Sequence, residues 1–107
     1  SDPVTVSSTK QYVKQNQKDV FGIKVLNPTG GLASIKIDGD CSLINGLSDT
    51  DSVVTNFPAG EVFEYALEID ATSGATAGEI KVCPLKITVD DGSDPREYYE
   101  TITINVE

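Results

Sequence analysis

The chain has 107 residues, which is the size of one domain built around a single hydrophobic core. Its net charge is −9, from 17 acidic and 8 basic side chains that are spread along the whole sequence. Such a surface disfavours nucleic acid and anionic lipid as partners, because both bind through clusters of Lys and Arg. The chain has no histidine, which removes the base of serine and cysteine hydrolases and the nitrogen ligands of zinc sites.

The chain also lacks methionine and any apolar run of the roughly 20 residues that a membrane span needs. We therefore expect residues 1–107 to be one module excised from a larger protein, with any export signal or anchor in the parent sequence.

Alternating apolar and polar residues predict a series of β-strands. The first begins at Val4 and Val6, with Val13 continuing it after a polar break. The next covers residues 18–26 and ends at the turn formed by residues 27–31, where proline and two glycines favour chain reversal. A third strand follows at residues 33–38. The side chains that these strands turn to the core are expected to be Phe21, Ile23, Val25, Ala33, Ile35 and Ile37.

The second half of the chain continues the same pattern. Residues 43–57 predict one or two short, irregular strands that cross an edge of the fold, and residues 63–69 predict the most regular strand. Residues 71–78 form a loop, and residues 90–95 a hairpin loop between the last two strands. The apolar side chains of these strands are Phe63, Tyr65, Leu67, Ile69, Ile80, Val82, Leu85, Ile87, Val89, Tyr98, Ile102, Ile104 and Val106.

The apolar positions change parity near Cys83 and Pro84. Ile80 and Val82 are even-numbered, whereas Leu85, Ile87 and Val89 are odd-numbered. A one-residue slip would turn every later side chain to the other face, so a β-bulge is predicted at Cys83–Pro84. No segment has helical periodicity. The sequence predicts an all-β fold, a two-sheet antiparallel β-sandwich of about seven strands.

Three short motifs resemble elements of the CARDB-like and S-layer-associated immunoglobulin-like domains of archaeal and bacterial surface proteins. They are Ile23–Gly30, which reads as a strand entering a turn, Pro58-Ala59-Gly60-Glu61, and Ala77-Gly78 before the strand at Ile80. The resemblance implies an immunoglobulin-like (fibronectin III/CARDB-like) module, repeated in exported proteins, with a structural or adhesive role. The chain departs from antibody domains, because it has no Trp and no cysteine in its second strand.

Cys41 and Cys83 are the only cysteines. An even count in a small domain predicts a disulfide and an oxidising compartment, with two buried thiols as the alternative. A bridge would close a loop of 83 − 41 = 42 residues, for which chain entropy gives roughly 4 kcal/mol of stabilisation.

Three groups of side chains are candidates for catalysis or ligand binding. The carboxylates Glu64 and Glu68 are interpreted as solvated residues of one strand face, not as a catalytic pair. Asp90, Asp91 and Asp94 are calcium candidates, but Asp, Gly and Ser are also what a hairpin turn prefers. The weaker acidic candidates are Asp38-Gly39-Asp40 and Asp49-Thr50-Asp51. Tyr12, Tyr98 and Tyr99 are the available platform for a sugar, and one of the adjacent pair Tyr98 and Tyr99 should be exposed.

We therefore expect a non-catalytic structural or adhesion module of an extracellular or cell-surface protein, acting as a spacer or protein-interaction domain. It would need no cofactor, would be monomeric alone, and would contact other domains of its parent or other surface proteins. The alternative is a carbohydrate- or calcium-binding accessory domain of an exported enzyme, which predicts a saturable polysaccharide or calcium signal.

Overall fold

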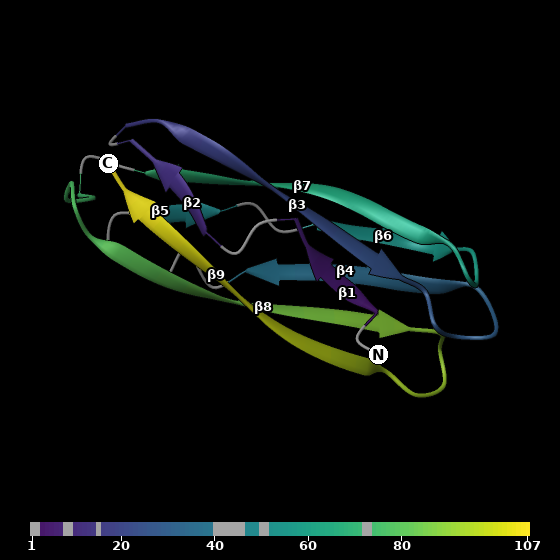
Figure 1. Cartoon of the computed structure of the whole chain (residues 1–107). Helices are drawn as coiled ribbons and strands as arrows, with labels where there is room; N and C mark the ends of the chain where they lie inside the picture. The colour runs from purple at the N-terminus through teal and green to yellow at the C-terminus, as the bar shows by residue number, and fades with distance from the viewer. Residues whose placement is uncertain (1–2, 8–9, 15, 40–46, 50–51, 72–73) are drawn as a thin grey trace.

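The computed structural model describes residues 3–7, 10–14, 16–39, 47–49, 52–71 and 74–107. This part of the chain forms nine strands in two facing sheets and contains no helix (Figure 1). The all-β, two-sheet prediction is therefore confirmed. Pairing in the described residues is antiparallel, as predicted, except between β2 and β9, which run parallel, so the antiparallel prediction fails only at this edge strand.

The first sheet has four strands in the order β1-β3-β7-β5. Its central pair is β3 with β7, joined over nine residues from the pair Lys18–Asp70 to the pair Leu26–Val62. Short strands cover only parts of the two edges. The bounds are β1 (Val4–Val6), β3 (Lys18–Leu26), β7 (Val62–Ala71) and β5 (Leu47–Asp49).

The second sheet has five strands in the order β2-β9-β8-β4-β6. The hairpin of β8 and β9 is its longest pairing, and β4 continues the sheet on the other side of β8. The bounds are β2 (Lys10–Val13), β9 (Arg96–Val106), β8 (Ile80–Asp90), β4 (Ala33–Gly39) and β6 (Ser52–Phe57).

The count of nine strands instead of about seven has two causes. The N-terminal segment divides, so that β1 pairs with β3 in one sheet and β2 pairs with β9 in the other. The stretch between β4 and β7 also divides, because β5 joins the first sheet and β6 joins the second. A single segment can thus supply edge strands to both sheets, which local periodicity does not reveal.

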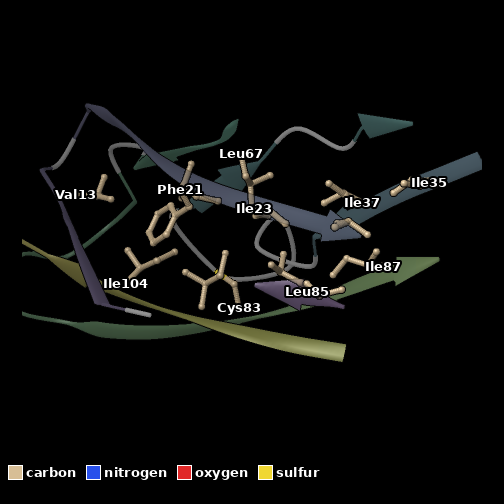
Figure 2. Packing of buried hydrophobic residues seen from close by; sticks show 14 of the residues in the cluster. Val13, Phe21, Ile23, Ile35, Ile37, Leu67, Cys83, Leu85, Ile87 and Ile104 are labelled. Atoms are coloured by element: carbon tan, nitrogen blue, oxygen red, sulfur yellow. The ribbon is translucent and has the colours of Figure 1, made fainter. Parts of the chain in front are cut away.

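Side chains from both inner faces fill the space between the sheets (Figure 2). Phe21 and Ile23 from β3 and Leu67 from β7 face residues of β4, β8 and β9, and all three are buried. The predicted core positions on β3 and β4 are all buried, which confirms them. Burying a side chain of this size contributes about 1.5–3 kcal/mol, so this apolar row is what holds the two sheets together.

The predicted bulge at Cys83–Pro84 was wrong. β8 pairs with β9 residue for residue from Ile80 to Val89, with Cys83 opposite Ile102. Cys83 is buried and continues the odd-numbered inner row, whereas Ile80 and Val82 are 67% and 51% exposed on the outer face. The error came from assigning these two apolar residues to the core, although apolar side chains are common on protein surfaces. An irregularity does occur elsewhere, between β4 and β6 at Ala33/Ile35.

The molecule is elongated, with principal extents of 45 × 20 × 17 Å. The main chain at Pro3 accepts a hydrogen bond from Leu26 N at 2.9 Å, at the end of the sandwich where β3 finishes. At the opposite end, Glu107 N donates to Val13 O at 2.8 Å. Figure 1 shows the two termini well separated along the sandwich.

Candidate functional sites and related structures

Asn27 forms a buried polar cluster at one end of the sandwich. It follows β3 at the next inward position after Phe21, Ile23 and Val25, and only 1% of its surface is exposed. Its Nδ2 donates to the carbonyl oxygens of Gly31 at 3.0 Å and Phe57 at 2.9 Å. Its Oδ1 accepts from the Thr29 main-chain N–H at 2.9 Å, and Thr29 Oγ1 lies 2.7 Å away.

The main chain of Asn27 connects the same two turns. Its N–H donates to Glu61 O at 2.9 Å, and its carbonyl accepts from Gly60 N at 3.0 Å, where Gly60 has a φ of 76°. Two motifs that begin 58 − 27 = 31 positions apart, Asn27-Pro28-Thr29-Gly30 and Pro58-Ala59-Gly60-Glu61, are therefore hydrogen-bonded to each other. Among the described residues, no buried side-chain N or O lacks a partner. The cluster uses its polar groups internally, so we assign it a structural role.

The sequence predicts only a turn in this segment and not the buried polar cluster. A signal was present, since odd-numbered residues of this strand face the core and the parity continues to positions 27 and 29. Asn27 and Thr29 are the two buried polar residues among those described.

The hairpin loop after β8 contains the calcium candidates Asp90, Asp91 and Asp94. Asp90 Oδ1 accepts from Gly92 N at 2.8 Å. Asp91 Oδ1 accepts from Ser93 N and Ser93 Oγ, both at 3.0 Å, and from Asp94 N at 3.4 Å. The bonds from Ser93 and then from Asp94 hold the pKa of Asp91 below its ordinary value of 3.8. Two of the three carboxylates are thus acceptors for the loop's own main chain, which is the arrangement of a hydrogen-bonded turn.

The other acidic candidates lie partly outside the described residues. Asp38 lies on β4, but Asp40, Thr50 and Asp51 fall outside the described residues. Within the described ranges, no group of three or more Asp, Glu, Cys or His side chains is arranged to hold a metal ion.

The three tyrosines do not form one platform. Tyr99 is 67% exposed and Tyr12 57% exposed, while Tyr98 packs partly against the core, which confirms that one of the adjacent pair is exposed. Tyr12 pairs with Asn105 of β9, six residues from Tyr99. Six residues of extended strand span about 20 Å, so the two exposed rings are too far apart to stack on the same sugar.

The outer face of β3 and β7 carries the predicted solvated carboxylates. Glu64 lies opposite Lys24 in the pairing, with 3.6 Å between Oε1 and Nζ, and Glu68 Oε2 lies 3.3 Å from Lys18 Nζ. These side chains are between 46% and 71% exposed. Exposed pairs of this kind contribute about 0–1 kcal/mol. A shallow hollow over Gly22 and Ala66 lies beside Lys24 and Glu64.

The outer face of the second sheet carries a three-residue network. Glu97 accepts from Tyr99 OH at 2.8 Å and lies 3.3 Å from Lys86 Nζ. The bond from Tyr99 and then that from Lys86 lower the pKa of Glu97, while the contact with Glu97 raises the pKa of Lys86 and of Tyr99. Each group thus keeps its usual charge at neutral pH, so the network is suited to fixing side chains in place and not to proton transfer.

Cys83 is buried in the inner face of β8, whereas Cys41 lies outside the described residues. No helix long and apolar enough to cross a membrane occurs in the described parts of the chain.

Comparison with known proteins shows the fold of the chain, but not its family or its function. No family model matches the chain, and no curated protein matches its sequence. Among solved structures, the fold is similar to that of the periplasmic chaperone SfaE, with a TM-score of 0.60 and 11% sequence identity. The match covers 97% of this chain but only 56% of the chaperone, so this chain spans little more than half the chaperone's length. The fold is that of an immunoglobulin-like β-sandwich.

Proposed function

We propose that this domain is a non-catalytic structural module of a cell-surface or secreted protein, acting as a spacer or protein-interaction domain. The observation that carries the proposal is the position of Pro3 and Glu107 toward opposite ends of a body 45 Å long and at most 20 Å wide. A domain joined at either end would continue along the long axis instead of folding back beside it.

The attachment of the two ends supports a role under tension. Near the N-terminus, β1 is paired with β3, and further on β2 is paired with the C-terminal strand β9 in parallel. Pulling the two ends apart along the long axis would load the β2–β9 pairing in shear, so that several hydrogen bonds must break together. This topology suits a module that holds other domains apart.

The exposure of the candidate carboxylates supports a role without catalysis. Glu64, Glu68 and Glu97 lie on exposed faces beside lysines, and Asp90 and Asp91 lie within the exposed hairpin loop. Catalytic acids and bases need burial or a like charge to shift their pKa toward neutrality. Here the shifts of Glu97 and Asp91 are downward, which keeps both groups ionised.

The disulfide and the oxidising compartment form the second part of the proposal. Gly39 of β4 pairs with Leu85 of β8 in an antiparallel register. Cys83 thus lies two residues from the partner of the last residue described on β4, and Cys41 follows that residue by two positions in the sequence. Cys83 faces the core, and the described residues include no free cysteine. The fibronectin III/CARDB-like subtype likewise stays part of this proposal.

Small-angle X-ray scattering of a polypeptide with two and three directly joined copies tests the spacer role. We expect the maximum dimension to grow by about one long axis, 45 Å, for each added copy. Copies that fold back on one another, with little growth in the maximum dimension, would contradict the proposal. A saturable polysaccharide signal by calorimetry with the single domain would instead favour the accessory-domain alternative.

Mass measurement with and without reductant, after thiol alkylation, tests the bridge. We expect no alkylation of the native protein and two alkylated cysteines after reduction. Two alkylated thiols in the unreduced, denatured protein would rule out the bridge and remove the main support for an oxidising compartment.

A further inference from the structure

Strand β6 is an open edge of the second sheet. It is the last strand in the order β2-β9-β8-β4-β6, and Figure 1 shows it beyond β4, on the side away from β8. Its main chain pairs with β4 on one side. In the part of the chain that the structure describes, the further hydrogen bonds and ring contacts of this strand are confined to Phe57, whose carbonyl accepts from Asn27 and whose ring lies beside Phe63. The outer edge of Ser52–Asn56 is therefore open to another strand.

The sequence of β6 leaves this edge unprotected. Proteins commonly block strand edges with charged side chains, with proline or by making the edge strand very short. Among the described edge strands, β1 and β5 have three residues each, and β2 begins with a lysine. By contrast, β6 has six residues, Ser-Val-Val-Thr-Asn-Phe, without charge, proline or glycine. Three of the six are β-branched, which favours an extended, paired backbone.

The side chains of this strand divide between the two faces of the sheet. Val54 lies opposite Ile35 and packs against the core, so its neighbours Val53 and Thr55 turn outward. Val53 is 62% exposed, and Thr55 is also exposed. The register irregularity between β4 and β6 and the φ of 55° at Asn56 end the regular part of the strand. The regular edge is therefore Ser52–Thr55.

A second copy of this chain fits the β6 edge because the segment is complementary to itself. The net charge of −9 makes two copies repel each other at long range, so they can pair only where the contact carries no like charges. Antiparallel pairing about a two-fold axis at Val54 confines the paired residues to Ser52–Asn56, and none of these is charged. Asp51 precedes this segment in the sequence, so an axis nearer the N-terminus would bring negative charge into the pairing.

The same axis matches the exposed side chains of the two copies. Residues directly opposite one another in an antiparallel pair share a face of the sheet. With Val54 on the axis, Val53 of each copy lies opposite Thr55 of the other. Both are β-branched, and such side chains pack well against neighbours on a pleated surface. Pairing would thus cover the exposed Val53 and satisfy the open main-chain groups of the edge.

We propose that the β6 edge Ser52–Thr55 is a homotypic interface, at which a second copy of this chain adds antiparallel with Val54 on the two-fold axis. The second sheets of the two copies then continue as one across the interface. This replaces the monomer expected from the sequence and goes beyond the spacer role. Because the two-fold axis reverses the strand direction, the two rods associate side by side and antiparallel, which suits contact between modules that project from facing surfaces.

Sedimentation equilibrium up to millimolar concentration tests the interface. We expect the wild type to dimerise, and Val53→Lys/Thr55→Lys to weaken the dimer by roughly tenfold or more, because it sets like charges opposite one another at two places. This loss is expected even though the net charge changes from −9 to −9 + 2 = −7, which reduces the long-range repulsion. Val53→Glu/Thr55→Lys sets opposite charges against each other in the proposed register and should retain dimerisation.

The variant Ile80→Lys/Val82→Lys is the matched control. These two residues are also exposed, apolar and two positions apart, but they lie on the outer face of β8, away from the edge. Their substitution makes the same change in net charge, so the dimer should be at least as strong as that of the wild type. Circular dichroism and urea unfolding show which variants fold, and the comparison uses only folded variants of similar stability.

Three results would overturn the interface. One is a wild type that stays monomeric up to millimolar concentration, and another is equal dimerisation of the wild type and Val53→Lys/Thr55→Lys. The third is a Val53→Glu/Thr55→Lys variant that dimerises no better than the double-lysine variant, because the register about Val54 would then be wrong. A monomer would leave the spacer proposal intact, since that rests on the positions of Pro3 and Glu107.

Discussion

Two loops of this domain use the same local hydrogen-bonding device in opposite environments. After β3, the side chain of Asn27 accepts from the main-chain N–H of Thr29 at 2.9 Å, and after β8 the side chain of Asp91 accepts from that of Ser93 at 3.0 Å. Asn27 is 1% exposed, whereas the Asp91 loop is open to solvent. The difference is that Asn27 also binds the carbonyl of Phe57, a residue distant in the sequence.

This difference predicts very unequal energies. A buried polar group that loses its partner costs about 1–3 kcal/mol, whereas a solvent-exposed one binds water instead. The turn after β3 therefore stabilises the whole sandwich, while the turn after β8 only shapes a hairpin.

The largest expected effect is that of Asn27→Ala. The substitution leaves the carbonyl of Phe57 and the N–H of Thr29 without this partner and removes one of the two donors to the carbonyl of Gly31, so we expect a loss of about 3 kcal/mol in the free energy of unfolding. Urea denaturation measures this loss. Asp90→Ala removes the matching acceptor for Gly92 in the exposed loop and should cost far less. Equal losses in the two variants would show that burial does not distinguish the loops.

A smaller effect on stability is expected from removing the hydroxyl groups of Thr29 and Ser93. Thr29→Val keeps the shape of a side chain that is 5% exposed but removes the group within 2.7 Å of Asn27 Oδ1, so a loss of about 1–2 kcal/mol is expected. Ser93→Ala removes the equivalent hydroxyl at Asp91 and should change stability by less than about 0.5 kcal/mol. Thermal unfolding of both variants compares them directly, and a larger loss for Ser93→Ala would reverse the order.

The pH dependence of stability should show a still smaller contribution from Asp91. Its pKa in the folded state lies below the ordinary value of 3.8, so the folded state favours the ionised form. The resulting stabilisation is full above pH 3.8 and disappears as the pH falls through the folded-state pKa. The stability difference between the wild type and Asp91→Asn should shrink over that range, measured by urea unfolding at several pH values. A difference that grows on acidification would contradict the assignment.

Calcium should have the smallest effect. Because Asp90 and Asp91 accept hydrogen bonds from their own loop, we expect no change in melting temperature at millimolar calcium. Magnesium at the same concentration controls for ionic strength. A rise in melting temperature with calcium that disappears in Asp91→Ala would instead establish a calcium site in this hairpin.

The long strands were predictable because their sequence pattern repeats over many residues. The expected segment at residues 18–26 coincides with β3, and the strands expected at 63–69 and 80–89 lie within β7 and β8. On β7, however, Phe63 and Tyr65 are only partly buried. The ring of Phe63 lies next to the rings of two other partly buried residues, with centroid distances of 6.3 Å to Tyr65 and 5.7 Å to Phe57.

The edges and the polar cluster were harder to predict. Whether a three- or four-residue segment such as β1 or β2 pairs in one sheet or the other depends on which edge is free, and its own sequence does not contain that information. The outward position of Ile80 and Val82 was hard to predict for a similar reason. Alternation fixes which residues share a face of a strand, but not which face the other sheet covers.

By itself, the sequence determined the all-β class, the turns and the face shared by each row of side chains, since these follow from local backbone preferences and a period of two. Only the tertiary structure decided the burial of Asn27 between two distant turns and the division of the N-terminal segment between the sheets. Each of these depends on which segments meet in space, and contacts between distant segments leave no periodic signal along the chain.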